Sequence, residues 1–148
     1  MGLFDMLQIS GSALSAERQR AEVVAANLAN AETTHTDAGG PFRRREVVFH
    51  AQTQPRFGML LASTAGLHSR PQGGVNVSEV VDDPTPAVRR YQPGHPDADK
   101  EGYVSYPAIN PLLEMVDLMG SVRAYQMNAS AVSAAKGMIQ QSIDILKS

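Results

Sequence analysis

The apolar pattern is most regular near the end of the chain. Apolar residues recur there at alternating steps of three and four, at Met115, Leu118, Val122, Tyr125, Ala129, Val132, Ile139, Ile143 and Leu146. This spacing is the a/d seam of a heptad repeat, and only Lys136 interrupts it. The pattern predicts a helix over residues 110–148, about 57 Å long at ~1.5 Å per residue.

Both ends of this predicted helix carry the expected signals. Asn110 suits the N-cap and Pro111 the first helical position. Glu114 and Asp117 place negative charge near the start, and Lys147 places positive charge near the end, as the helix dipole favours.

The faces of this helix away from the seam are mostly small or weakly polar. Between Leu118 and Leu146 the charged residues are Arg123, Lys136 and Asp144. A lone surface helix would show a charged outer face, so we expect other copies or other proteins to cover this one. Gly120 and Gly137 each cost about 1 kcal/mol against Ala in a helix, and we interpret them as points of close approach between subunits.

A second long helix is predicted over residues 3–30. Leu7, Leu14, Ala21 and Leu28 repeat every seven residues, although the middle of the segment is more charged. The simplest arrangement pairs the two terminal segments, 1–34 and 109–148, as an antiparallel or crossing hairpin. The alternative is an ordinary amphipathic helix packed on its own domain.

Residues 41–108, between these helices, predict a small β domain. β-Branched and aromatic residues favour strands at 43–49, 75–81, 87–91 and 102–106, in one unit of three to four strands. Residues 51–74 lack a steady period and predict an irregular loop. The fold class is therefore α+β, with a β domain inserted between long terminal helices.

Composition narrows the possible functions. The chain is 43% hydrophobic but only 5% aromatic, and its net charge of -2 argues against general nucleic-acid binding. We interpret the run Arg43, Arg44 and Arg45 as a solvated face or as salt-bridge partners. The absence of Cys excludes disulfides and Cys-based zinc sites. We expect no Sec signal peptide and no membrane span.

One segment resembles a calcium-binding loop in part. Asp97, Asp99 and Glu101 stand at positions 1, 3 and 5, with Gly102 at position 6, but Ala108 replaces the bidentate Glu of position 12. A solvated acidic turn is the simpler interpretation. The four His residues show no metal-ligand spacing. We therefore predict no catalytic residue, no metal site and no cofactor.

Three stretches resemble the flagellar rod and hook axial proteins, and in particular the basal-body rod proteins of the proximal rod. The first is the Asn-rich motif after the first helix, with Ala26, Asn27, Leu28, Ala29, Asn30 and Thr33. The second is GPFRRREVVF, residues 40–49, and the third runs from YQPGHPDAD, residues 91–99, through GYV and NP to EMVD and SVRAYQ.

This resemblance implies a structural subunit of the bacterial flagellar basal body, exported by the flagellar type III apparatus into the periplasmic rod. Its partners would be other copies, neighbouring rod subunits and the export apparatus. The heptad residues and Leu7, Leu14 and Leu28 would form the assembly interface, and residues 27–34 would fix how the first helix meets the β domain. The alternatives are a soluble coiled-coil adaptor or secretion-associated interaction protein, and a calcium-binding or hydrolytic module.

Overall fold

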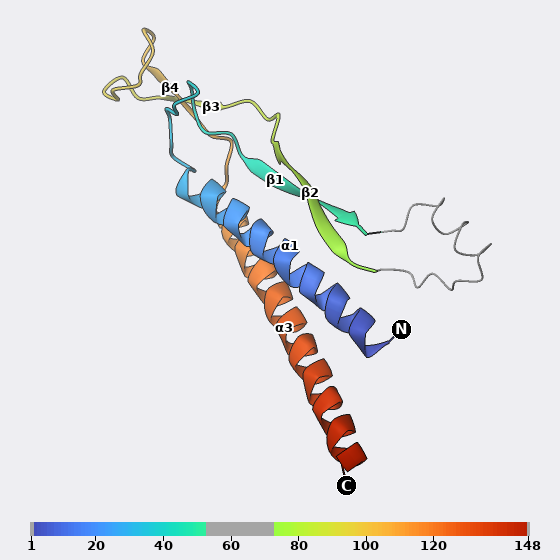
Figure 1. Cartoon of the computed structure of the whole chain (residues 1–148). Coiled ribbons are helices and arrows are strands. Elements are labelled where there is room, and N and C mark those ends of the chain that lie inside the picture. The colour runs from blue at the N-terminus through green and yellow to red at the C-terminus, as the bar shows by residue number, and fades with distance from the viewer. Residues whose placement is uncertain (1, 53–72, 148) are drawn as a thin grey trace, which may run out of the picture.

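Two long antiparallel helices form the body of the molecule (Figure 1). The structure, a computed structural model, describes residues 2–52 and 73–147. Helix α1 spans Leu3–Ala29 and helix α3 spans Pro111–Lys147. Because α3 is longer, its C-terminal part extends beyond the start of α1. Four strands of the described residues lie between these helices in sequence, so the predicted α+β class is confirmed.

The helix starts carry polar caps. The carboxylate of Asp5 accepts a hydrogen bond of 2.7 Å from the backbone N–H of Gly2. At α3 the side-chain oxygen of Asn110 accepts from the N–H of Leu112 at 3.0 Å, which confirms the predicted N-cap. Lys147 lies in the last turn, as expected.

The strands do not form the single β unit that the sequence predicted. Strand β1 (Arg45–Ala51) pairs with β2 (Val75–Asp82), and β3 (Val88–Tyr91) pairs with β4 (Tyr103–Tyr106). Both pairs are antiparallel, and they are separate two-stranded sheets. Pro84 and Pro86 lie between them, and proline cannot donate to a continued ladder. The first strand also starts two residues later than the predicted residue 43.

The β1–β2 sheet packs on α1. The hydroxyl of Ser12 accepts from the N–H of Val75 at 3.1 Å and donates to the carbonyl of Ile9 at 2.8 Å. At Gly74 a Cβ atom would come within 3.1 Å of the Ser12 hydroxyl, so the backbone approaches α1 closely there. The predicted irregular loop 51–74 lies mostly outside the described residues.

The β3–β4 sheet forms the end of the molecule away from the N- and C-termini of the chain (Figure 1). Val104 is fully buried, and the Arg90 guanidinium stacks 4.8 Å from the centre of the Tyr106 ring. A hydrogen bond of 2.6 Å from Thr34 to Asp97 ties this end to the turn after α1. None of the described helices combines the length and apolar character needed to cross a membrane.

Candidate assembly interface and polar junction

Helices α1 and α3 and strand β1 meet at a buried asparagine. Asn27, fully buried, donates from Nδ2 to the carbonyl of Arg45 at 2.8 Å and accepts at Oδ1 from the N–H of Arg45 at 2.9 Å. The same Nδ2 donates to Oε2 of Glu114 at 3.1 Å. One amide therefore bonds the backbone of β1 and a side chain of α3.

Glu114 is the second member of this junction. It is 1% exposed, and its other carboxylate oxygen accepts from Nε of Arg44 at 2.6 Å. A carboxylate this deeply buried is stable only when it is paired and hydrogen-bonded, and both its oxygens have partners. Those partners come from α1 and from the residue before β1, so Glu114 ties α3 to both.

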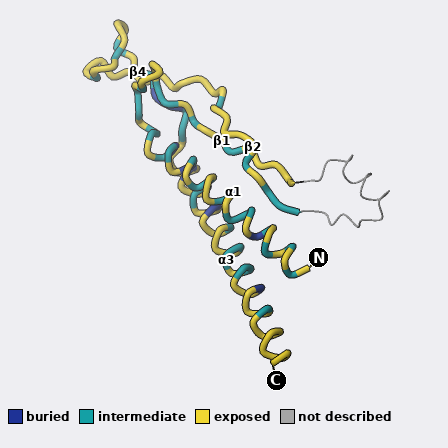
Figure 2. Tube along the Cα trace, viewed as in Figure 1, coloured by how far each residue is buried: buried dark blue, intermediate teal, exposed yellow. Residues whose placement is uncertain are grey.

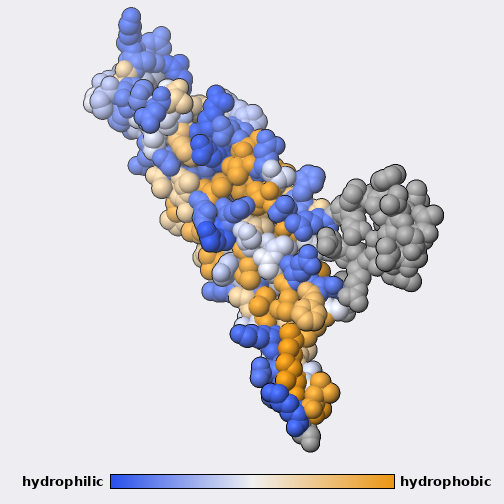
Figure 3. Space-filling view, in the orientation of Figure 1, coloured by the Kyte–Doolittle hydropathy of each residue, from blue (hydrophilic) through white to orange (hydrophobic). Residues whose placement is uncertain are grey.

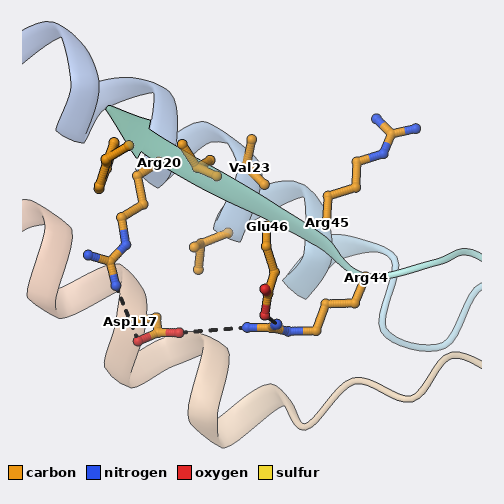
Figure 4. Close-up of a pocket in the computed structure, with 9 residues that line it drawn as sticks. Arg20, Val23, Arg44, Arg45, Glu46 and Asp117 are labelled. Atoms are coloured by element: carbon orange, nitrogen blue, oxygen red, sulfur yellow. Dashed lines mark hydrogen bonds and ion pairs between the residues drawn. The ribbon is translucent and has the colours of Figure 1, made fainter. Parts of the chain in front are cut away.

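Arg44 gathers three further carboxylates around the buried pair. Its guanidinium pairs with Glu46, with Asp83 at 3.7 Å and with Asp117 at 3.8 Å. Figure 4 shows Arg20 reaching from α1 to the same Asp117, and Nη2 of Arg20 lies 3.6 Å from Oδ1 of Asp117. The predicted salt-bridge role of the Arg run is thus confirmed for Arg44, and we name Asn27, Arg44 and Glu114 the polar junction.

Hydrogen bonds at and beside the junction shift the pKa values of Arg44 and Asp83. Burial opposes the charged form of Arg44, but the hydrogen bonds that its guanidinium donates to Glu114 and Glu46 raise its pKa above the usual value. The side chain of Thr85, followed by its backbone N–H, lowers the pKa of Asp83. Both shifts favour the charged forms that hold β1 and β2 at the junction.

The Asn-rich motif covers the last residues of α1, through Ala29, and the turn that follows from Asn30. Nδ2 of Asn30 donates to the carbonyl of Ala26 at 2.9 Å, and Thr33 donates to Oδ1 of Asn30 at 3.1 Å. Leu28 is half-buried and Ala29 is exposed. The motif therefore has one member in the junction and two that close the helix end.

The predicted heptad seam of α3 is partly half-buried and partly exposed in the structure. Among the described elements α3 packs against α1 alone, and Leu118, Ala129, Val132 and Ile139 are half-buried. The other five seam residues are exposed to solvent: Met115, Val122, Tyr125, Ile143 and Leu146. Leu7, Leu14 and Leu28 of α1 are all half-buried.

The residues of α3 buried most deeply were not in the predicted seam. Glu114, Ser121 and Ala135 are buried and Asn128 is half-buried, and these four follow one another every seven residues. Their spacing was a usable signal, but the large apolar residues beside them dominated the pattern. For Glu114 the sequence indicates a charge favourable to the helix dipole and a place in the EMVD stretch of the family resemblance, but not a buried position.

The calcium-like segment uses its carboxylates within the chain. Oδ1 of Asp99 accepts from the N–H groups of Glu101 at 2.9 Å and Tyr103 at 2.8 Å, and Oδ2 pairs with Arg89. Asp97 accepts from Thr34. Across residues 2–52 and 73–147 there is no group of three His, Cys, Asp or Glu side chains arranged to hold a metal ion.

Two family models match the two ends of the chain. One, described as flagella basal body rod protein, matches residues 7–34, which hold most of α1 and the Asn-rich turn. The other, described as flagellar basal body rod FlgEFG protein C-terminal, matches residues 100–145, which hold β4 and nearly all of α3. The matched residues include Asn27 and Glu114.

Curated relatives extend this similarity over nearly the whole chain. The flagellar basal-body rod protein FlgC of Bacillus subtilis is 39% identical over 99% of this chain and 100% of its own length. FlgC of Borreliella burgdorferi is 33% identical over 99% of both chains, and FlgC of Escherichia coli O6:H1 is 36% identical over 98% of both. The chain therefore belongs to the FlgC family of flagellar basal-body rod proteins, which are structural proteins and not enzymes.

Proposed function

We propose that this chain is a subunit of the proximal rod that assembles through its terminal helices into a helical tube and transmits torque. The observation that carries this proposal is the apolar surface left exposed on α3. Large apolar side chains are exposed along much of that helix, with Leu112 69%, Met127 68% and Leu146 87% exposed. A soluble monomer rarely leaves so long an apolar surface uncovered, and such surfaces mark protein interfaces.

The shape of the chain supports the same proposal. In Figure 2, α3 is exposed over most of its length, and in Figure 3 its C-terminal part presents a continuous apolar strip. The predicted interface residues Met115, Val122 and Tyr125 lie on the exposed surface of α3. Helices of neighbouring subunits, packed along this surface, would bury these side chains, at about 1.5–3 kcal/mol for each large one.

Partners and location follow from the same proposal. The partners are other copies of this chain and neighbouring rod subunits, and the flagellar type III apparatus exports the chain to a rod in the periplasm. Family membership supports the basal-body location, and the exposed helices support packing against other subunits. Nucleic acid has no part in this function.

A deletion strain gives the direct test. Isolated basal bodies are viewed by electron microscopy, with the full-length chain supplied in trans as the control. We expect the membrane ring to form without a rod, hook or filament beyond it, and complementation to restore all three. Complete flagella in the deletion strain would overturn the proposal and favour an adaptor role.

A further inference from the structure

The residues of α3 that face α1 repeat every seven positions, so the two helices could pair in more than one alignment. The buried line on α3 consists of Glu114, Ser121, Asn128 and Ala135, one residue per heptad. Apart from Glu114, these side chains are small or neutral. A helix that slides by one heptad, about 10 Å, would place Ser121 where Glu114 now lies and would keep a small or neutral residue at every other site of this line.

The hydrogen bonds of two polar members of this line do not depend on how α3 is aligned with α1. The hydroxyl of Ser121 donates to the carbonyl of Leu118 at 2.8 Å, and Nδ2 of Asn128 donates to the carbonyl of Ala124 at 2.9 Å. Both bonds stay within α3. They would survive unchanged whichever residue of α1 lay opposite.

Glu114 differs because both its partners lie outside α3. Asn27 of α1 and Arg44, next to β1, supply the donors for its two oxygens. A slide of one heptad would take the carboxylate away from both donors, so the buried pair with Arg44 and the hydrogen bond from Asn27 would be lost. The correct alignment is therefore the one that satisfies Glu114.

We propose that the polar junction of Asn27, Arg44 and Glu114 is a register lock that selects one alignment of α1 and α3 among those that the seven-residue spacing of the buried line allows. Glu114 is the positioning residue. Asn27, in α1, and Arg44, next to β1, bind its two carboxylate oxygens and so fix where it lies. This role goes beyond subunit assembly, since it concerns the fold of the single chain and does not depend on the rod.

Cross-linking in the purified full-length chain tests the lock. The native chain has no Cys, so a pair of introduced cysteines reports one alignment without background. Arg20→Cys with Asp117→Cys reports the alignment of the structure, in which these side chains meet at 3.6 Å. Arg20→Cys with Ala124→Cys reports a slide of one heptad. A short bismaleimide joins each pair, and the intramolecular product is measured in the monomeric fraction by gel mobility and mass spectrometry.

Glu114→Leu is the main variant, since leucine fills the site without needing donors. Arg44 keeps Glu46 and Asp83, and Asn27 keeps the backbone of Arg45, so no other buried group is left alone. We expect helix content by circular dichroism to be retained. The ratio of the 20–117 product to the 20–124 product should fall by about tenfold or more, because the penalty on sliding has gone.

Two matched variants separate alignment from stability. Glu114→Gln keeps an acceptor for Asn27 and should keep most of the 20–117 product. Ser121→Ala changes the next residue of the same line, whose bond stays within α3, and should leave the ratio unchanged. The proposal is overturned if Glu114→Leu gives only the 20–117 product, or if Ser121→Ala lowers the ratio of the 20–117 to the 20–124 product as much as Glu114→Leu does. It is also overturned if the 20–117 product is missing without any change at 114, or if both Glu114 variants lose their helices.

Discussion

Asn27 matters as a single residue because its three hydrogen bonds join three segments of the chain. Asn27→Ala would leave the N–H and the carbonyl of Arg45 and one oxygen of Glu114 without this partner at a fully buried site. Each unsatisfied buried group costs about 1–3 kcal/mol, so the loss of three partners should lower the free energy of unfolding by about 3 kcal/mol or more. Urea unfolding followed by circular dichroism measures the change.

Asn128→Ala is the matched control for that substitution. Asn128 is half-buried and bonds only the Ala124 carbonyl of its own helix. Its loss should cost less than about 1 kcal/mol, partly because Ala favours a helix more than Asn does. Equal losses from the two substitutions would show that the junction has no special role in stability.

Asp99 gives a prediction about pH. The N–H of Tyr103 contributes most to lowering the pKa of this carboxyl; burial opposes the shift, and the N–H of Glu101 and the Arg89 guanidinium add to it. Because the pKa of Asp99 is lower in the folded chain, this carboxylate stabilises the fold at pH values above its unfolded pKa of about 3.9. That stabilisation is lost as the pH falls through the folded pKa. The amide shift of Tyr103, followed by NMR, should therefore titrate with a midpoint below that of an ordinary Asp.

Asp99→Asn provides the comparison, since it keeps an acceptor oxygen but cannot titrate. The acid transition of the Tyr103 amide should disappear in this variant. A transition that persists would mean that another group titrates there.

At the scale of elements, the sequence predicted the helices and strands of the described residues to within a few residues, but not how the strands combine. Periodicity and β-branched residues act locally, so they locate elements such as Val75–Asp82. Whether strands share a sheet depends on the path between them, and Pro84 and Pro86 interrupt that path. Among the site residues, Asn27 was found through its motif, whereas the role of Glu114 depends on a partner 87 residues away in sequence.

Gly120 tests whether α3 approaches a neighbouring subunit closely. A Cβ atom at this position would meet nothing within 4 Å in the single chain. Gly120→Ala should therefore raise the free energy of unfolding by up to about 1 kcal/mol, since Ala is the better helix former. If a neighbouring backbone lies against this glycine, motility in soft agar should fall although the chain is more stable. Unchanged motility would argue against close approach at this position.

At the scale of the whole molecule, two valines of α3 separate folding from assembly. Val122 is 44% exposed, so Val122→Asp should leave the free energy of unfolding almost unchanged but prevent incorporation into the rod. Val132 is half-buried, so Val132→Asp should both destabilise the chain and block incorporation. Urea unfolding and electron microscopy of basal bodies measure the two effects, and normal rods in both variants would refute the packing proposal.

Removing the end of α3 separates assembly from folding most clearly, because this end lies far from the polar junction. Residues 140–147 are all exposed and extend past the start of α1 (Figure 2). Removing residues 140–148 deletes Ile143 and Leu146 of the predicted interface and leaves Glu114, with its partners Asn27 and Arg44, intact. The free energy of unfolding should change by less than about 1 kcal/mol, whereas motility should be lost. If the shortened chain still supported swimming, the apolar end of α3 would have no part in assembly, and the interface would lie on the exposed surface nearer Met115.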